Sequence, residues 1–440
     1  MLRNCGSPVL VSLLVALVPS CGWSQKTVPE VGNSALILKA PVRITRSIRV
    51  APGVYTVAAP PDGAVIEIAA DNVVLDLSGV TLLAPPTEPW NRQGVGIRSS
   101  GHSHVTVTKG RISGYRVNVQ LAAGTGLGIE GSNVGASRAQ RLRSTPDHYD
   151  DSDWVDIFHL AAWQNYGAGL WLQDATDVTV QHVVADGAQN GIVLVDVHRA
   201  TVQGNQASHN SGWGIALFRS SDNRILGNHA DWNVRCESAS YSHGCDSAGV
   251  LLMEGSNRNT LVDNTFSHSG DGYFSSRAPA GSSSDDNVVA YNDGSDSPHN
   301  AFESTFTSGD QFVGNTADRS DYGFWLGFSR ETTVIGNRVV GSRHDGIAIE
   351  HGSGNRLLHN QICDSKGAGI RLFRRGGAPD PSRNYVLLRN VICGNGTGLV
   401  IAKSQQVTVV GNRFENNGRA IDTDAASDGV DVHANRIRPR

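Results

Sequence analysis

Short apolar runs alternate with turns rich in glycine and asparagine through the C-terminal two-thirds of the chain. The apolar runs follow a glycine, as in GIALF, GVLLM, GIAIE and GIRLF. An asparagine recurs with them at Asn205, Asn228, Asn264, Asn292, Asn315, Asn337, Asn360, Asn390, Asn412 and Asn435. The spacings are 23, 36, 28, 23, 22, 23, 30, 22 and 23 residues. One strand and one turn in each period of 20–25 residues is typical of a solenoid.

The repeated asparagines predict a ladder at one corner of an all-β solenoid. An asparagine amide can donate to and accept from the same amide in the neighbouring coils, and asparagine tolerates the left-handed φ of a turn. The longer spacings of 36, 28 and 30 residues indicate coils with an inserted loop. Inserted loops are where such folds carry function. We expect the solenoid to span residues 71–440, after an N-terminal cap and first strands at 25–70.

The period breaks at residues 134–168, which contain the acidic and aromatic stretch TPDHYDDSDWVDIFHLAAW. This segment has three interpretations. It is a solvated insertion, or a lid that carries Trp154 and Trp163 over a cleft. A calcium site with oxygen ligands from Asp147, Asp150, Asp151 and Asp153 is the third.

Charge and hydropathy limit the partners and the compartment. The net charge is −4 and the lysines are scattered, so no basic stripe is present for a nucleic acid or an anionic membrane. Residues 1–24 are expected to be a signal peptide, because Arg3 precedes an apolar run, Val9 to Val18, too short to span a membrane. Cleavage near Ser24 is favoured over a lipoprotein site at Cys21. The mature chain is therefore expected to be secreted or periplasmic, without a membrane span.

Four cysteines remain beyond the leader, an even number that suits an oxidising compartment. Cys363 in NQIC and Cys393 in NVIC hold the same place in successive coils. Neighbouring strands lie about 4.8 Å apart, so these two thiols are predicted to form a disulfide. Cys236 and Cys245 bracket an inserted loop and are predicted to close it. The alternative is four reduced thiols.

Strings such as GNQASHNSGWGIALFRSSDNRILGN and GNRVVGSRHDGIAIEHGSGNRLLHN resemble the repeats of the pectate-lyase-like superfamily, over roughly residues 70–435. The resemblance implies a right-handed parallel β-helix. It also implies a protein that cuts, epimerises or binds polysaccharides. The repeats are similar, too, to those of the periplasmic maturation factors for the copper site of nitrous-oxide reductase.

Aligning the coils on the glycine before each strand predicts which side chains face outward. The inward positions are Ile215, Val250, Tyr273, Phe302, Phe324, Ile347 and Ile370. The outward positions that follow them are Ala216, Leu251, Phe274, Glu303, Trp325, Ala348 and Arg371. Polar and aromatic residues gather on this outer face over neighbouring coils. We therefore expect a groove that runs along the coils from Asp246 to Glu350.

The groove predicts a glycoside hydrolase acting on a neutral or weakly charged glycan. Asp271 and Glu303 are the expected paired carboxylates, roughly 5–9 Å apart, which covers the separations of retaining and inverting enzymes. Crowded carboxylates raise one another's pKa, so one can hold a proton near neutral pH. The other candidate catalytic residues are His299, His344, Asp345 and Glu350. The candidate substrate-binding residues are His243, Asp246, Phe274, Tyr322, Trp325, Arg371 and Trp154. No cofactor is expected, apart from the possible calcium.

Two alternatives remain open. The string YNDGSDSPHN resembles the Asp-Pro-His motif of mannuronan epimerases, which implies a polysaccharide lyase or uronate C5-epimerase using Tyr291, Asp296 and His299. It departs from that motif at Ser297 and Asn300. We expect no lysine in the groove, although Arg277, Arg343 and Arg371 are near, and the carboxylates would repel a polyuronate.

The other alternative is a non-catalytic periplasmic binding or assembly module. His243, His299, His344 and His351 would then bind a metal. The sequence contains no HxH or HExxH pattern to make a compact site.

Overall fold

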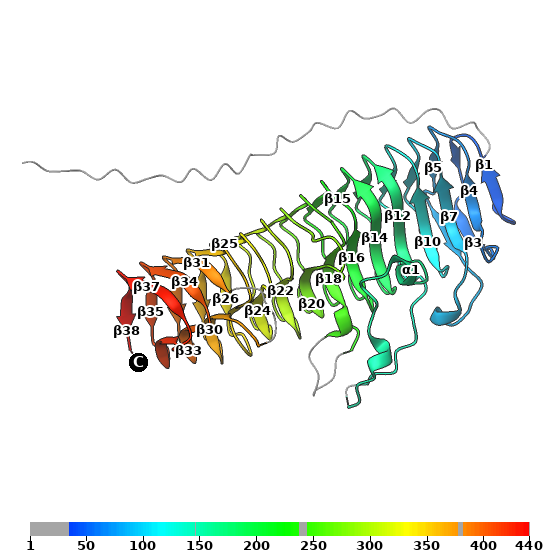
Figure 1. Cartoon of the computed structure of the whole chain (residues 1–440). Coiled ribbons are helices and arrows are strands. Elements are labelled where there is room, and N and C mark those ends of the chain that lie inside the picture. Colours follow the sequence, from blue (N-terminus) through cyan, green and yellow to red (C-terminus); the bar gives the residue numbers. More distant parts are fainter. Residues whose placement is uncertain (1–34, 146, 237–243, 377–381, 440) are drawn as a thin grey trace, which may run out of the picture.

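The computed structural model describes residues 35–145, 147–236, 244–376 and 382–439. Strands stack side by side along one axis, so that the first and last coils form opposite ends of an elongated molecule (Figure 1). The expected signal peptide, the possible lipid site at Cys21 and the candidate His243 lie outside the described residues. No helix in the described ranges is long and apolar enough to cross a membrane.

Three faces of parallel strands enclose the core. The first face is a 15-stranded sheet. In spatial order its strands are β1 (Val42–Ile44), β4 (Ala64–Ile68), β7 (Val95–Ser100), β10 (Val117–Ala122), β12 (Ala168–Thr176), β14 (Asn190–His198), β16 (Trp213–Phe218), β18 (Ala248–Met253), β20 (Asp271–Ser276), β22 (Asn300–Ser304), β24 (Tyr322–Trp325), β27 (Ile347–Glu350), β30 (Ala368–Phe373), β33 (Thr397–Ala402) and β36 (Arg419–Thr423).

The second face is another 15-stranded sheet. Its strands are β2 (Ile48–Arg49), β5 (Val74–Asp76), β8 (Thr106–Thr108), β11 (Gly128–Glu130), β13 (Thr179–Gln181), β15 (Thr201–Gln203), β17 (Arg224–Leu226), β19 (Thr260–Val262), β21 (Val288–Ala290), β23 (Gln311–Val313), β25 (Thr333–Ile335), β28 (Arg356–Leu358), β31 (Arg383–Leu388), β34 (Gln405–Val410) and β37 (Asp428–His433).

The third face has strands at both ends and single-residue bridges between them. The strands are β3 (Gly53–Thr56), β6 (Val80–Leu83) and β9 (Arg111–Ser113) at one end, and β26 (Arg338–Val340), β29 (Gln361–Cys363), β32 (Val391–Cys393), β35 (Arg413–Glu415) and β38 (Arg436–Arg438) at the other. Parallel bridges from Asn133 to Thr316 continue this face through the middle coils. Because crossovers between parallel strands are right-handed, the chain forms the expected right-handed parallel β-helix.

Helices are few and short. They are α1 (Leu160–Trp163) and the 3₁₀ turns η1 (Pro89–Asn91), η2 (Asp151–Asp153) and η3 (Gly244–Asp246).

The strand register confirms the predicted inward and outward columns. Ile215, Val250 and Tyr273 are successive partners on β16, β18 and β20, and all three are fully buried in the core. The outward column continues from Phe274 through Glu303 to Trp325 on β20, β22 and β24. Side chains on the outer surface of the first face therefore stand one strand apart, at a spacing of about 4.8 Å.

The asparagine ladder is confirmed, and it is continuous from Asn205 to Asn435. Asn264 shows the repeated geometry. Its Oδ1 accepts from the backbone N–H of Asn228 at 2.8 Å and from Asn228 Nδ2 at 2.9 Å. Its Nδ2 donates to the carbonyl of Ile225 at 2.9 Å and to Asn292 Oδ1 at 2.8 Å. Each amide thus joins three coils.

The expectation that asparagine itself supplies the left-handed turn is wrong. The residue with positive φ is the one before it, as at Gly204 (φ 63°), Gly227 (φ 57°) and Asp263 (φ 55°). Glycine takes this conformation at low cost, which explains the frequent Gly-Asn pair. The asparagine then uses its amide for the ladder alone.

Both predicted disulfides are present. The Cα atoms of Cys363 and Cys393 are 4.5 Å apart and belong to paired positions on β29 and β32. Cys236 and Cys245 are joined across a loop, with Cα atoms 5.5 Å apart. The alternative of four reduced thiols is therefore wrong.

A second ladder, which the sequence analysis missed, runs through Asn223, Asn259 and Asn287 and reaches Asp310. Asp310 is fully buried and accepts from the backbone N–H of Asn287 at 2.8 Å. Burial raises the pKa of this carboxyl to about 7. A carboxyl group that retains a proton more readily than an ordinary aspartate thus stands where neighbouring coils place an asparagine.

We predict that Asn264→Ala lowers the free energy of unfolding by on the order of 3 kcal/mol, because buried groups of Asn228 and Ile225 lose their partners. Denaturant unfolding measures the change. Asn91→Ala is the control, since Asn91 is exposed and the substitution should change stability by less than about 0.5 kcal/mol. Equal effects of the two substitutions would contradict a stabilising ladder.

Asp310→Asn is predicted to stabilise the protein above neutral pH. The native carboxyl, with its pKa raised from 3.8 to about 7, binds a proton that the unfolded chain has released, so wild-type stability falls as pH rises between those values. Asparagine stays neutral and removes this loss. Unfolding curves at about pH 4 and about pH 8 should show the variant gaining stability only at the higher pH. Asp62→Asn, at an exposed position, serves as the control; a gain at both pH values would refute the titration argument.

Candidate functional site

The N-terminal part of the first face is covered on its outer surface by residues 134–168. Val155, Ile157 and Trp163 of this segment pack against outward side chains of the sheet in a second apolar cluster. The Trp163 ring lies 4.2 Å from that of Trp213 and 5.0 Å from that of Phe218, and it is fully buried. The part of the segment from Asp153 to Tyr166 is therefore a packed cover, whereas the described residues from 141 to 152 are exposed or half-buried.

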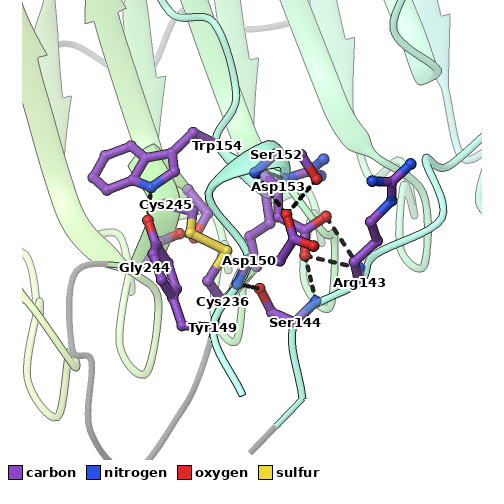
Figure 2. The surroundings of a disulfide bond; sticks show 12 residues. Arg143, Ser144, Tyr149, Asp150, Ser152, Asp153, Trp154, Cys236, Gly244 and Cys245 are labelled. Carbon is purple, nitrogen blue, oxygen red and sulfur yellow. Dashed lines mark hydrogen bonds between the residues drawn. A yellow bond between two sulfur atoms is a disulfide. The ribbon is translucent and has the colours of Figure 1, made fainter.

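The cover is fastened to the loop closed by the Cys236–Cys245 disulfide (Figure 2). The backbone N–H of Val155 donates to the carbonyl of Cys245 at 3.3 Å. Asp153 accepts from the backbone N–H groups of Arg143 and Ser144. Since Asp246 follows Cys245 directly, the disulfide also fixes the turn that carries Asp246.

The expected calcium site does not form from the aspartates of residues 134–168. Asp150 caps η2 by accepting from Ser152, and Asp153 is buried on backbone groups. In the described part of the chain, these aspartates do not bring three carboxylate ligands within 4.8 Å of one another.

Two predicted aromatic contacts are misplaced. Phe274 is only 6% exposed because it packs in the second apolar cluster, so it offers no open face to a sugar. Trp154 is 38% exposed but lies beside the disulfide, in contact with Tyr149 (Figure 2). The sequence places both residues on the correct surface but does not show what packs over them.

Where the cover ends, four titratable residues meet on adjacent coils. This carboxylate cluster consists of Asp246, Asp271, His299 and Glu303. His299 Nδ1 lies 3.0 Å from an oxygen of Asp271 and 3.9 Å from one of Glu303. One ligand atom from each of these three residues lies within 4.8 Å of the others, closer than the sequence predicts for the two acids. The imidazole of His299 lies between Asp271 and Glu303 and allows the two carboxyl groups to approach each other this closely.

Uncharged hydrogen-bond donors hold the carboxyl groups of Asp271 and Glu303 in place. The backbone N–H of Asn300 donates to Asp271 at 2.9 Å, and Asn300 Nδ2 donates to Glu303 at 2.5 Å. The Thr305 hydroxyl donates to the other oxygen of Glu303 at 2.8 Å. The Asp271 side chain is 2% exposed, that of Glu303 13% and that of His299 23%. Solvent therefore reaches the cluster through His299 and Glu303.

Crowding changes the protonation of the cluster. Burial raises the pKa of Asp246 to about 8, aided by the charges of Asp271 and Glu303. Burial and the charge of Asp271 raise the pKa of Glu303 to about 7 against the opposing effect of His299. Burial alone would lower the pKa of His299, but the two acids overcome it and raise that pKa to about 9. The cluster retains protons at neutral pH.

An open trough begins one strand beyond the cluster. Its volume is about 690 Å³, and it crosses β24, β27, β30 and β33. Tyr322 and Trp325 stand next to Asn300 and Glu303 in the strand register, so trough and cluster adjoin. The full lining is Tyr322, Trp325, Arg343, His344, Asp345, Lys366, Gly367, Arg371, Phe373, Arg374, Arg375, Ala402 and Lys403.

Several predicted acids are held by arginines. Asp345 accepts from Arg371 Nε at 2.6 Å and from the backbone N–H of Ala368. Glu350 lies 3.5 Å from Arg375 Nε and 3.8 Å from His351 Nε2. Asp345 and Glu350 thus position the walls of the trough.

Aromatic side chains line the near end of the trough. The half-exposed His344 stacks on Tyr322, with ring centroids 5.3 Å apart. The edge of Trp325 meets Tyr322, and Arg375 lies over its ring at 5.5 Å. The predicted binding residues Tyr322, Trp325 and Arg371 do share one site.

The prediction that no lysine enters the groove is wrong. Lys366, just before β30, and Lys403, just after β33, both line the trough. The sequence analysis also missed Arg374 and Arg375, although the pair follows the β30 strand directly. Arg277 is not among the lining residues; it lies over the Phe306 ring.

The epimerase-like motif is not assembled. Both carboxylate oxygens of Asp296 are taken by Arg319, at 2.7 and 2.6 Å. His299 instead faces Asp271 and Glu303, and Tyr291 is 50% exposed. Residues close in sequence point away from one another at a corner of the coil.

Solved structures with a similar fold act on glycans according to their descriptions. The catalytic domain of a GH87 α-1,3-glucanase in complex with nigerose is 13% identical, with a TM-score of 0.52, over 89% of this chain and 64% of that chain. The A-module of mannuronan C-5 epimerase AlgE6 from Azotobacter vinelandii is 14% identical, with a TM-score of 0.47, over 90% of this chain and 91% of that chain. At such identities the likeness shows the fold alone.

The sequence comparisons are more specific. No curated protein sequence matches the chain. A family model described as "Periplasmic copper-binding protein (NosD)" matches residues 77–277 and 275–434, which is most of the solenoid. The chain belongs to the NosD family.

Proposed function

We propose that the protein is a periplasmic or secreted polysaccharide-active enzyme that cleaves glycosidic bonds, with Glu303 as the proton donor. The observation that carries the proposal is the carboxylate cluster, in which a carboxyl group with a raised pKa lies beside a second carboxylate at the start of an open trough. Family membership and the two disulfides support an extracytoplasmic location.

Glycoside cleavage requires such a pair. Glu303 would give its proton to the glycosidic oxygen, and water would complete the hydrolysis at the anomeric carbon. Asp271 would stabilise the positive charge that develops on the sugar, or form the covalent intermediate. The close approach of the two acids is nearer to the separation of retaining enzymes than to that of inverting ones. Trp325 would stack on a neighbouring sugar ring.

A lyase or C5-epimerase is the second candidate, and the cationic trough favours it. Abstraction of a proton beside a uronate carboxylate needs a base and a cation that neutralises the carboxylate. Arg371 and Lys366 would supply the cation, and His344 stacked on Tyr322 would supply the proton-transfer groups. The products distinguish the two, since elimination gives an unsaturated uronate that absorbs in the ultraviolet.

The copper named by the family description does not fit the residues described here. Soft copper favours thiolate, thioether and several imidazole ligands. Cys236, Cys245, Cys363 and Cys393 are in disulfides, and Met253 is fully buried in the apolar cluster.

The described residues offer one group with ligand spacing, Asp271, His299 and Glu303. It has a single imidazole and two carboxylates, a set that suits harder cations. The raised pKa of His299 also keeps a proton on the nitrogen that a metal would need. Copper therefore enters no step of the proposed reaction.

Glu303→Gln is predicted to lower kcat by about 10²–10⁴, because glutamine cannot transfer the proton. Release of reducing ends from a panel of polysaccharides measures turnover. Glu130→Gln, at an exposed position on β11, is the matched control and should retain activity. Turnover of the Glu303 variant close to that of wild type would remove Glu303 from the mechanism.

Asp271→Asn is predicted to lower the pKa of His299 from about 9 toward its ordinary value of 6.5, because the nearest anion is lost. Nuclear magnetic resonance of the imidazole protons follows the titration in the folded protein without any substrate. The exposed pair His433 and Asp431 gives an internal reference that should not change. A His299 titration that is unaltered by the substitution would contradict the cluster geometry.

A further inference from the structure

The trough carries a strong excess of positive charge. Six of its lining residues are cationic, Arg343, Lys366, Arg371, Arg374, Arg375 and Lys403, and one, Asp345, is acidic. Asp321 and Glu350 pair with Arg343 and Arg375 from just outside the lining. These three acids offset three of the six cations, and Lys366 and Lys403 are among the others. The chain as a whole has a net charge of −4, so this charge is local.

The two lysines account for much of the excess. Lys366 precedes β30 and Lys403 follows β33, so they approach the trough from opposite ends of the strands. Both are exposed, and no ion pair holds either of them among the described residues. Exposed cations that converge on one site attract an anion.

Aromatic rings stand between these cations. Trp325 and Phe373 meet edge to face with centroids 6.1 Å apart, and both line the trough. Rings of this kind accept the C–H faces of sugars, and the surrounding guanidinium and ammonium groups bind oxyanions. A ligand that uses both has a sugar ring and an anionic substituent.

We infer that the trough binds an anionic sugar unit, so that the substrate is an acidic glycan. The anionic group is a carboxylate, a sulfate or a phosphate, which share the chemistry that lysine and arginine recognise. The trough adjoins Glu303 through Trp325, and the bound unit is therefore a near neighbour of the bond to be cut. This inference rests on the proposed function for the identity of that bond, but it is tested by binding alone.

The experiment measures binding to the full chain by calorimetry, with Glu303→Gln as background to prevent turnover. The probes are tetragalacturonate, tetramannuronate, sulfated maltotetraose, phosphorylated maltotetraose, neutral maltotetraose and inorganic sulfate. At least one acidic tetrasaccharide should bind about tenfold more tightly than maltotetraose, and its affinity should fall as salt is added. The acidic probe that binds identifies the anionic group.

Two double variants are compared. The test variant combines Lys366→Gln with Lys403→Gln, and the control combines Lys39→Gln with Lys109→Gln. Both pairs remove two exposed lysines, but only the first pair lies in the trough. The first pair should weaken binding of the acidic probe about tenfold, whereas the second should leave it unchanged. Circular dichroism confirms that each variant is folded.

The inference would be overturned by the absence of binding by every acidic probe, by binding of maltotetraose as tight as that of the acidic probes, or by equal effects of the two lysine pairs. Inorganic sulfate that binds as tightly as the acidic sugars would also overturn it, since the sugar would then add nothing. If acidic glycans bind as predicted but are not hydrolysed, the proposed function fails and the binding inference stands. If a neutral glycan is cleaved and acidic probes do not bind, the binding inference fails and the proposed function stands.

Discussion

The structure depends on the requirement that each coil satisfy its polar turn groups with the coil next to it. A solenoid has no second layer to cover its corners, so the backbone groups at every turn face either solvent or a neighbouring turn. The amide of Asn264 meets this requirement, because it joins the turns of Asn228 and Asn292 and also reaches the carbonyl of Ile225. The ladder therefore sets the register of the coils. Once the register is fixed, every outward side chain lies one strand from its counterpart.

The outer surface of the first face is available for a functional site, because the inward column and the ladders hold the coils together. The outward residues differ between two parts of this face. On β12 to β18 many outward residues are apolar, and the cover packs on part of them, as Trp163 does on Trp213. Beyond Phe274 the column changes to Glu303, Trp325 and Arg371, which remain accessible.

Sequence reasoning succeeds here where the repeat itself carries the information. The asparagine spacing predicts the ladder, and the shared place of Cys363 and Cys393 predicts their disulfide, since both follow from a one-dimensional register. Sequence reasoning fails for contacts between residues that do not hold equivalent places in successive coils. The packing of Trp163 on Trp213 lies outside the repeat, and Lys366 and Lys403 stand in turns outside β30 and β33, whose course the repeat does not define. Sequence distance also misleads at corners, where Asp296 and His299 diverge.

The charges on the exposed part of the face are separated along the coils. The acids of the carboxylate cluster lie between η3 and β22, without an arginine or lysine partner among the described residues. Over β24 to β33 the cations outnumber the acids, and Asp321, Asp345 and Glu350 are each paired with an arginine. In the proposed reaction on an acidic glycan, the cations would hold the anionic sugar. The acids, whose pKa values are raised by burial and by one another, would keep the protons that cleavage needs. A mixed distribution would pair the arginines with the acids and lower the pKa of each carboxyl, as Arg319 does for Asp296. Separation along the solenoid is what allows a proton donor and an anion site to stand one strand apart.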